Sequence, residues 1–219
     1  PDSNALTALM MASLTGRVDV VRLLLTAKST PPLDVNATCK KGWTALMLAC
    51  YFGRLEVVRL LLSGGHGVAV NPRVDVNVQG TDGWTLLMQT VARGHADVVE
   101  LLLTTRPTEI AVKATSRGGW TALMVACFTG NVPVIRALLS HPTTPPIDIH
   151  ARTSGRWSTF LCASAKGNIG ALTELLAYSA KSLRPLDLNM RAEKGRSALL
   201  MAVIKGHAEI VRTLLSYPE

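Results

Sequence analysis

Short apolar segments recur along the chain, each framed by the same two kinds of residue. A threonine or serine precedes the segment and a glycine stands nine positions later, in the pairs Thr7/Gly16, Thr44/Gly53, Thr85/Gly94, Thr121/Gly130, Ser158/Gly167 and Ser197/Gly206. A hydroxyl group can cap the N-terminus of a helix, and glycine readily adopts the left-handed backbone that ends one. The pattern therefore predicts a short helix in each of six repeats.

A second apolar segment follows each glycine, as in RLEVVRLLL and HADVVELLL. Its leucine triplets are expected to be the buried stripe of a second helix, at Leu23–Leu25, Leu60–Leu62 and Leu101–Leu103. Small residues stand five positions after the hydroxyl, where neighbouring helices would have to approach closely, at Ala12, Ala49, Ala126, Ala163 and Ala202. The sequence thus predicts a helix, a turn and a second helix, repeated six times.

This repeat resembles the ankyrin repeat, in which a Thr-Pro-Leu-His segment, a Gly-His turn, a Val-Val-x-Leu-Leu-Leu helix and an Asp-Val-Asn segment follow one another. Asp34-Val35-Asn36 and Asp75-Val76-Asn77 match the last of these. The resemblance implies an all-α solenoid of stacked helix-turn-helix units with extended hairpin loops. It implies a single domain over residues 1–219, with repeats at approximately 1–37, 38–78, 79–114, 115–151, 152–190 and 191–219.

The chain departs from the family pattern in two ways. The family's histidine is replaced by an apolar residue, at Met10, Met47, Met88, Met124, Leu161 and Leu200, so apolar packing should replace its hydrogen bonds between repeats. Successive hydroxyl residues are 37, 41, 36, 37 and 39 positions apart, against about 33 in the family. The extra residues lie in the connections after each second helix, where STPPLDV at 29–35 and TTPPIDI at 143–149 predict stiff, extended segments.

Cysteine usage and hydropathy indicate the cellular compartment of the chain. Cys39, Cys50, Cys127 and Cys162 form no Cys-x-x-Cys pair, and four cysteines are too few for a disulfide scaffold. No apolar run reaches the length of about 18 residues that a membrane span needs. We therefore expect an intracellular, cytoplasmic location, with Cys50 and Cys127 as core thiols.

Motifs of catalysis are missing from the sequence. No Ser/His/Asp order, His-Glu-x-x-His helix or phosphate-binding Gly-x-x-x-x-Gly-Lys-Ser/Thr loop occurs. His95 and His207 stand at the turn that follows the glycine, a position where histidine belongs to the repeat pattern and does not indicate catalysis. The sequence predicts a chain that is not an enzyme and needs no cofactor or metal.

All four tryptophans share one position, directly before the hydroxyl residue. The resemblance places this position on the hairpin side of the repeat, where relatives contact partners. The alternative is that each indole lies over the preceding hairpin and stiffens the stack. Positions seven and eight after the hydroxyl add aromatic and basic side chains to this concave side. The candidate partner-binding residues are Lys40, Lys41, Trp43, Tyr51, Phe52, Trp84, Arg93, Arg117, Trp120, Phe128 and Trp157.

The net charge of +8 bears on the class of partner. Residues 1–150 carry 13 basic and 10 acidic side chains, whereas residues 151–219 carry 10 and 5. The leading hypothesis is a non-catalytic protein–protein interaction scaffold whose partner has an acidic or extended peptide surface. RNA or nucleotide binding, and a role as regulatory arm of a larger enzyme, remain alternatives. Because both end repeats have apolar outer positions, end-to-end self-association or membership of a longer protein is also expected.

Overall fold

The computed structural model describes residues 6–27, 33–63, 73–142, 147–181 and 187–217. The chain forms two compact units, unit 1 (Pro1–Ala111) and unit 2 (Val112–Glu219). In the proline-containing strings, residues 29–32 and 143–146, which include both proline pairs, lie outside the described ranges. The single domain expected from the sequence stays a prediction.

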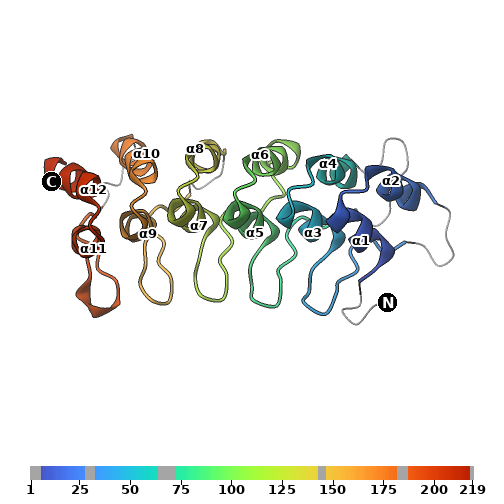
Figure 1. The fold of residues 1–219 in the computed structure, drawn as a ribbon, viewed down its shortest axis with the longest axis horizontal. Helices are drawn as coiled ribbons and strands as arrows, with labels where there is room; N and C mark the ends of the chain where they lie inside the picture. Colours follow the sequence, from blue (N-terminus) through green and yellow to red (C-terminus); the bar gives the residue numbers. More distant parts are fainter. Residues whose placement is uncertain (1–5, 28–32, 64–72, 143–146, 182–186, 218–219) are drawn as a thin grey trace. The chain divides into compact units, whose positions relative to one another are not determined.

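Unit 1 contains three pairs of helices. The first helices of the pairs pack side by side, the second helices form another layer behind them, and hairpins extend from the first-helix layer (Figure 1). In chain order the pairs are α1 (Ala8–Thr15) with α2 (Val18–Thr26), α3 (Ala45–Tyr51) with α4 (Leu55–Ser63), and α5 (Leu86–Arg93) with α6 (Ala96–Thr105).

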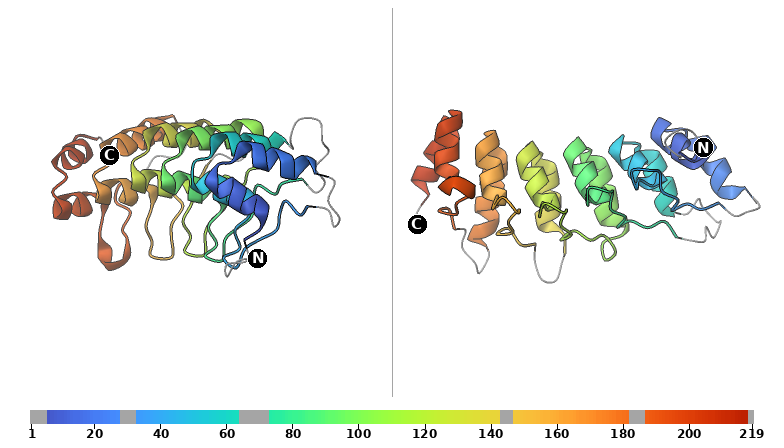
Figure 2. Two further views of the ribbon diagram at one scale, coloured as in Figure 1. Left: turned by 45° about the vertical axis from the view of Figure 1, so that its right-hand side comes forward. Right: turned by 90° about the horizontal axis from the view of Figure 1, so that it is seen from below.

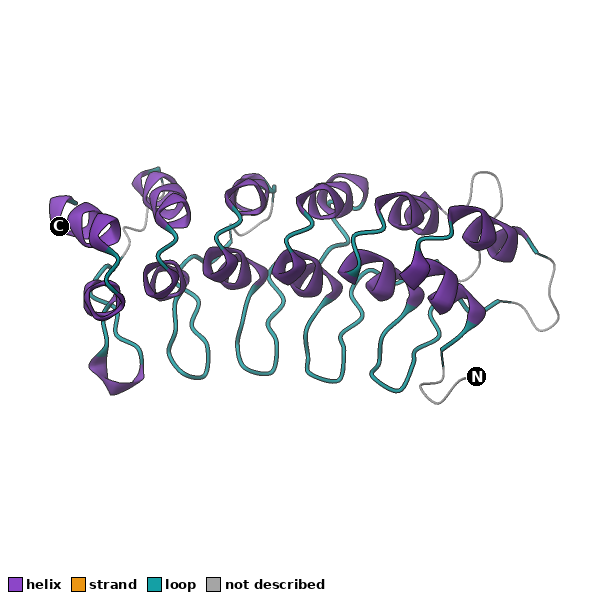
Figure 3. Cartoon of the chain, in the orientation of Figure 1, coloured by secondary structure: helices purple, strands orange, loops and turns teal. Residues whose placement is uncertain are grey.

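Unit 2 repeats this arrangement, as two further views confirm (Figure 2). Its pairs are α7 (Ala122–Thr129) with α8 (Val132–Ser140), α9 (Thr159–Lys166) with α10 (Ile169–Ala180), and α11 (Ala198–Lys205) with α12 (Ala208–Ser216). The short 3₁₀ helix η1 (Glu193–Gly195) lies in the hairpin before α11. The described residues are otherwise turn and loop apart from isolated β-bridges, so the all-α class is confirmed (Figure 3).

The predicted helix boundaries are confirmed by their caps. Each of the six hydroxyl residues accepts a hydrogen bond from the backbone N–H three positions on, as Thr44 does from Met47 at 3.2 Å. The glycines have positive φ, for example 77° at Gly130. Helix α3 ends one residue early, with Phe52 as C-cap, yet Gly53 still has a φ of 65°. Local chemistry therefore sets the length of every first helix.

The apolar residues in the histidine position pack as predicted, with one exception. Met10, Met47, Met88, Met124 and Leu161 are buried, but Leu200 is 44% exposed. Helix α11 packs against α9 and α12, whereas α9 has first helices on both sides. The expectation of burial is wrong for Leu200 because it belongs to the last repeat.

The leucine triplets are also less uniform than the sequence suggests. Leu60–Leu62 are buried between neighbouring second helices, whereas Leu23 is 69% exposed. Helix α2 packs against α1 and α4, while α4 lies between α2 and α6. The buried stripe predicted at Leu23–Leu25 is therefore wrong for Leu23, and at the end repeats an apolar side chain lacks the neighbour that buries it elsewhere.

One set of hydrogen bonds between repeats comes from the residue that follows the glycine. Its side chain reaches a backbone carbonyl near the end of the preceding repeat's first helix: Arg54 bonds to Leu14, His95 to Tyr51, Asn168 to Cys127 and Phe128, and His207 to Ala165, at 2.8 to 3.4 Å. A histidine in this role donates its Nε2 hydrogen. These bonds join neighbouring repeats in the absence of the family's buried histidine.

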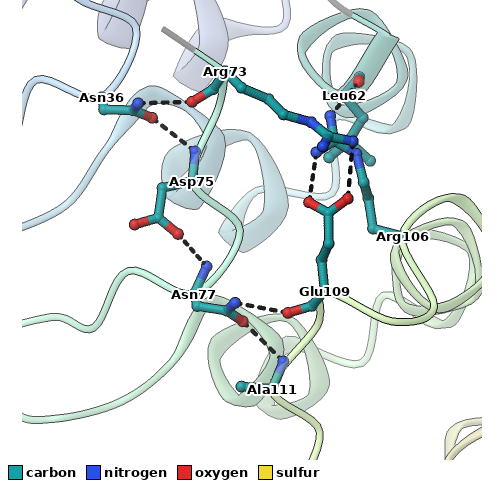
Figure 4. Close-up of polar contacts among 8 residues, drawn as sticks. All are labelled: Asn36, Leu62, Arg73, Asp75, Asn77, Arg106, Glu109 and Ala111. Carbon is teal, nitrogen blue, oxygen red and sulfur yellow. Dashed lines mark hydrogen bonds and ion pairs between the residues drawn. The ribbon is translucent and has the colours of Figure 1, made fainter.

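The Asp-Val-Asn segments join neighbouring connections in unit 1 (Figure 4). The Asn36 amide donates to the carbonyl of Arg73 and accepts from the N–H of Asp75, at 2.9 and 2.8 Å. Asn77 does the same with Glu109 and Ala111. Each asparagine thus satisfies both a donor and an acceptor of the next repeat, which fixes the spacing of the hairpins.

One buried charge was not predicted from the sequence. The Arg106 side chain is 7% exposed and donates to the carbonyl of Leu62 and to Glu109, both at 2.8 Å (Figure 4). Arg73 reaches the other oxygen of the same carboxylate at 2.8 Å. This cluster fastens the connection after α6 to the end of α4.

Candidate partner-binding surfaces

The four tryptophans are half-buried, and three of them pack against hairpin glycines. A Cβ atom placed on Gly118 would lie 3.4 Å from the ring of Trp120, and one on Gly155 would lie 3.4 Å from Trp157. Trp43 lies close to Gly80 in the next hairpin. Glycine lets the indole approach the backbone. Trp120 and Trp157 thus pack on their own hairpins and Trp43 packs on the next one, whereas the sequence suggested the preceding hairpin; of these three glycine contacts, that of Trp43 alone joins neighbouring repeats. Contact of the tryptophans with a partner stays a prediction.

Unit 1 brings four of the predicted site residues together, and we call Trp43, Tyr51, Phe52 and Arg93 the Tyr51 cluster. The ring centroids of Trp43 and Tyr51 are 4.8 Å apart, and those of Tyr51 and Phe52 are 5.1 Å apart. The Arg93 guanidinium lies 4.5 Å from the centre of the Tyr51 ring. The Tyr51 ring thus contacts both an indole and a cation, while Phe52 stays 39% exposed.

Unit 2 contains a related group, the Phe128 cluster of Trp120, Phe128 and Lys166. Trp120 meets Phe128 edge to face at 5.7 Å, and Nζ of Lys166 lies 4.3 Å from the Phe128 ring centre. Sequence reasoning did not select Lys166. The available signal was its register, because Lys166 follows Ser158 by eight positions just as Arg93 follows Thr85.

The other predicted residues lie outside these clusters. Lys40, Lys41 and Arg117 are exposed in the hairpins. Trp84 in unit 1 and Trp157 in unit 2 are half-buried, and within the described ranges neither makes a ring contact with another aromatic side chain. Six of the eleven candidate residues therefore belong to a cluster, four in unit 1 and two in unit 2.

Three of the cysteines are core thiols, as predicted for Cys50 and Cys127. Burial raises the pKa of Cys50 and of Cys162 to about 12. Burial also raises the pKa of Cys127 well above its ordinary value, and the nearby Cys162 adds to that rise. Since the thiolate is the reactive form, these side chains are unreactive near neutral pH. Nowhere in the described segments do three or more His, Cys, Asp or Glu side chains gather as they would around a metal ion.

Thiol labelling checks this arrangement. Under native conditions near neutral pH, iodoacetamide is expected to label the partly exposed Cys39 and to spare Cys50, Cys127 and Cys162. Peptide mass spectrometry would locate the label, with the unfolded chain as the control in which all four react. Labelling of Cys50 as fast as Cys39 would contradict the burial of the first-helix layer.

Within the described residues, no helix has the length and apolar character that crossing a bilayer requires.

Comparisons with known proteins agree on the repeat. A family model described as ankyrin repeats (3 copies) matches residues 1–74 and 64–153, and a model of the single ankyrin repeat matches 194–218. A search of curated protein sequences found no match.

Two solved structures share the fold. The ankyrin repeat domain of Bcl-3, a member of the IkappaB protein family, is 24% identical with a TM-score of 0.76, covering 97% of this chain and 86% of that one. The second is a chain in the structure of the Bd0816 predatory endopeptidase from Bdellovibrio bacteriovorus in complex with immunity protein Bd3460. It is 22% identical with a TM-score of 0.77, covering 97% of this chain and 99% of that one. At sequence identities this low, the similarity to both structures shows the fold alone.

Proposed function

Because the chain belongs to the ankyrin-repeat family, we propose that it is a non-catalytic protein–protein interaction scaffold. Its contacts with the partner come from the aromatic and basic residues of the first helices and hairpins. The Bdellovibrio structure, in which a chain of this fold occurs within a protein–protein complex, supports the proposal.

The observation that carries the proposal is the Tyr51 cluster. Aromatic side chains and arginine are enriched among the residues that dominate binding energy at protein interfaces. Here an exposed Phe52 stands beside a Tyr51 ring that Arg93 and Trp43 already hold in place. A side chain held in this way loses little conformational freedom on binding, which favours affinity.

The same contacts argue against a surface on which nucleic-acid bases stack. Base stacking requires an open ring face. One face of Tyr51 is occupied by Arg93, and one face of Phe128 is occupied by Lys166. A protein partner can use the outer edges of these rings and the exposed Phe52, so we favour protein over RNA or nucleotide.

The test is affinity capture with a paired variant. We expect Phe52→Ala combined with Arg93→Ala to lower the recovery of the partner at least about tenfold, because two central contacts are lost. Arg59→Ala is the matched control, since Arg59 is exposed on the second helix α4 and should not contact the partner. Quantitative mass spectrometry of nuclease-treated lysate gives the readout, and circular dichroism shows whether the helices are intact.

Three outcomes would contradict the proposal. Recovery could be equal for the wild type and the double variant, Arg59→Ala could abolish capture as fully as the double variant does, or the captured material could be lost on nuclease treatment. The last result would favour the RNA alternative.

A further inference from the structure

Arg156 holds a backbone conformation that its side chain disfavours. Its φ is 59°, and it is the one residue other than glycine with positive φ in the described segments. L-residues with a Cβ atom are strained in this left-handed region. Something other than the local fold is needed to explain an arginine at this position.

The same position in the other described hairpins is glycine. Gly42, Gly83, Gly119 and Gly195 each stand two residues before the helix-capping hydroxyl, with φ between 68° and 77°. Arg156 stands two residues before Ser158. Glycine would make the same turn without strain, so the arginine at this point weakens the fold. Strain of this kind concentrates at functional sites.

The neighbouring hairpins bring further arginines next to Arg156. The N–H of Ser154 donates to the carbonyl of Gly118 at 2.9 Å, and the N–H of Glu193 donates to that of Gly155 at 3.4 Å. Arg117 precedes Gly118 and Arg156 follows Gly155, so the hydrogen-bonded turns place both arginines on one hairpin edge of unit 2. Exposed basic side chains in the same hairpins are Arg117, Arg152, Arg156, Arg191 and Arg196.

The acidic side chains of unit 2 leave this edge positively charged. Unit 2 has 13 basic and 6 acidic residues, whereas unit 1 has 10 and 9. Asp148 and Asp187 accept hydrogen bonds within their own loops, and Glu174 pairs with Arg136 between α10 and α8. The exposed Glu193 of η1 lies in the same hairpins as the five exposed arginines, so the edge keeps an excess of positive charge. Within the described part of unit 2, the hairpin arginines make no ion pair. Their side chains are exposed and available to a ligand.

We propose that Arg156 and its neighbouring arginines recognise carboxylates of an acidic segment in the protein partner. The inference rests on the proposed function and adds the chemistry of the partner. A guanidinium can bind a carboxylate with two parallel hydrogen bonds. An exposed arginine in this turn is therefore well suited to binding a carboxylate. We favour a protein segment over a nucleic acid at this edge, because bases need an open aromatic face and the nearby half-buried Trp157 packs against Gly155 of its own hairpin.

Arg156→Gly tests binding separately from folding, because the fold should tolerate glycine at this position. Glycine relieves the strained φ, so the melting temperature should be no lower than that of the wild type. With a fluorescein-labelled oligoglutamate peptide as probe, we expect about tenfold weaker binding by fluorescence anisotropy, as for loss of one charge-assisted hydrogen-bonded pair. Arg156→Lys keeps the charge without the planar fork and should fall between the two.

Arg212→Ala is the matched control, since it removes the same charge from the exposed surface of the second helix α12. It should weaken peptide binding by no more than about twofold, through net charge alone. Wild-type affinity in Arg156→Gly, an equal loss in Arg212→Ala, or binding of an RNA oligonucleotide but not of oligoglutamate would each overturn the inference.

The two proposals can fail separately. If capture of the partner depends on Phe52 and Arg93 while Arg156→Gly binds oligoglutamate normally, only the inference about Arg156 is wrong. If Arg156→Gly weakens peptide binding but the Phe52 and Arg93 variant captures the partner normally, only the Tyr51 cluster is wrongly assigned.

Discussion

Replacing Gly130 by alanine is expected to lower the free energy of unfolding by about 3 kcal/mol. The φ of 77° at Gly130 makes any Cβ atom unfavourable by about 1 to 2 kcal/mol. The new Cβ would also lie 2.6 Å from Oδ1 of Asn168. Asn168 would have to move and give up its bonds to the carbonyls of Cys127 and Phe128, which contribute about 1 kcal/mol or more.

Gly206→Ala is the matched control for this prediction. Gly206 occupies the same position in its repeat with a φ of 74°, but no heavy atom lies within 4 Å of its added Cβ. It should therefore show the backbone effect alone, about 1 to 2 kcal/mol. Urea denaturation followed by circular dichroism measures both variants. Equal losses would mean that the side chain after each glycine does not hold neighbouring repeats together.

Arg106→Met is expected to destabilise unit 1 by about 3 kcal/mol, the usual effect of breaking a buried charged contact. Methionine can fill much of the volume of the arginine chain but cannot donate to the carbonyl of Leu62, which would lose its partner. Glu109 would keep Arg73, which limits the loss on the carboxylate side. Urea denaturation, with the midpoint and slope both fitted, gives the change in free energy.

Arg73→Met tests whether the exposed ion pair or the buried contacts of Arg106 stabilise this cluster. The Arg73 side chain is 66% exposed although it contacts the same carboxylate at 2.8 Å. An exposed ion pair contributes about 0.5 kcal/mol, so this variant should be close to the wild type. A loss as large as that of Arg106→Met would show that the ion pair stabilises the connection more than the buried bond to Leu62 does.

The helices could be predicted from the sequence because their ends are determined locally. Thr44 accepts from an N–H three residues away, and Gly53 changes the backbone at its own position. Such signals recur in each repeat and need no knowledge of distant residues. The burial of the apolar residues in the histidine position could also be predicted. An apolar residue on a short helix is buried wherever a helix packs on each side of it.

What the sequence did not reveal depends on contacts between repeats. Asn168 reaches Cys127, and Arg106 reaches Leu62, across about one repeat length of chain. A charged residue in a connection is usually solvated, so nothing marked Arg106 as buried. The burial expected for Leu23 and Leu200 was wrong because a periodic pattern does not register that the end repeats have a neighbour on one side.

The candidate site was predicted in part. Aromatic residues seven positions after the hydroxyl were recognised in Tyr51 and Phe128, and both pack against a tryptophan. The cations that cover them come from the following repeat, and only Arg93 was selected while Lys166 was passed over. Arg156 was missed because its significance lies in a backbone angle, which becomes visible only when five hairpins are compared.

Footprinting of the chain in complex with its captured partner tests the central claim most directly. Hydroxyl-radical labelling with mass spectrometry should show protection of Phe52, Phe128 and the hairpin residues next to them when the partner is bound. The exposed faces of the second helices α4 and α8 should label equally with and without partner. Protection confined to those second helices, with Phe52 and Phe128 unchanged, would contradict the account.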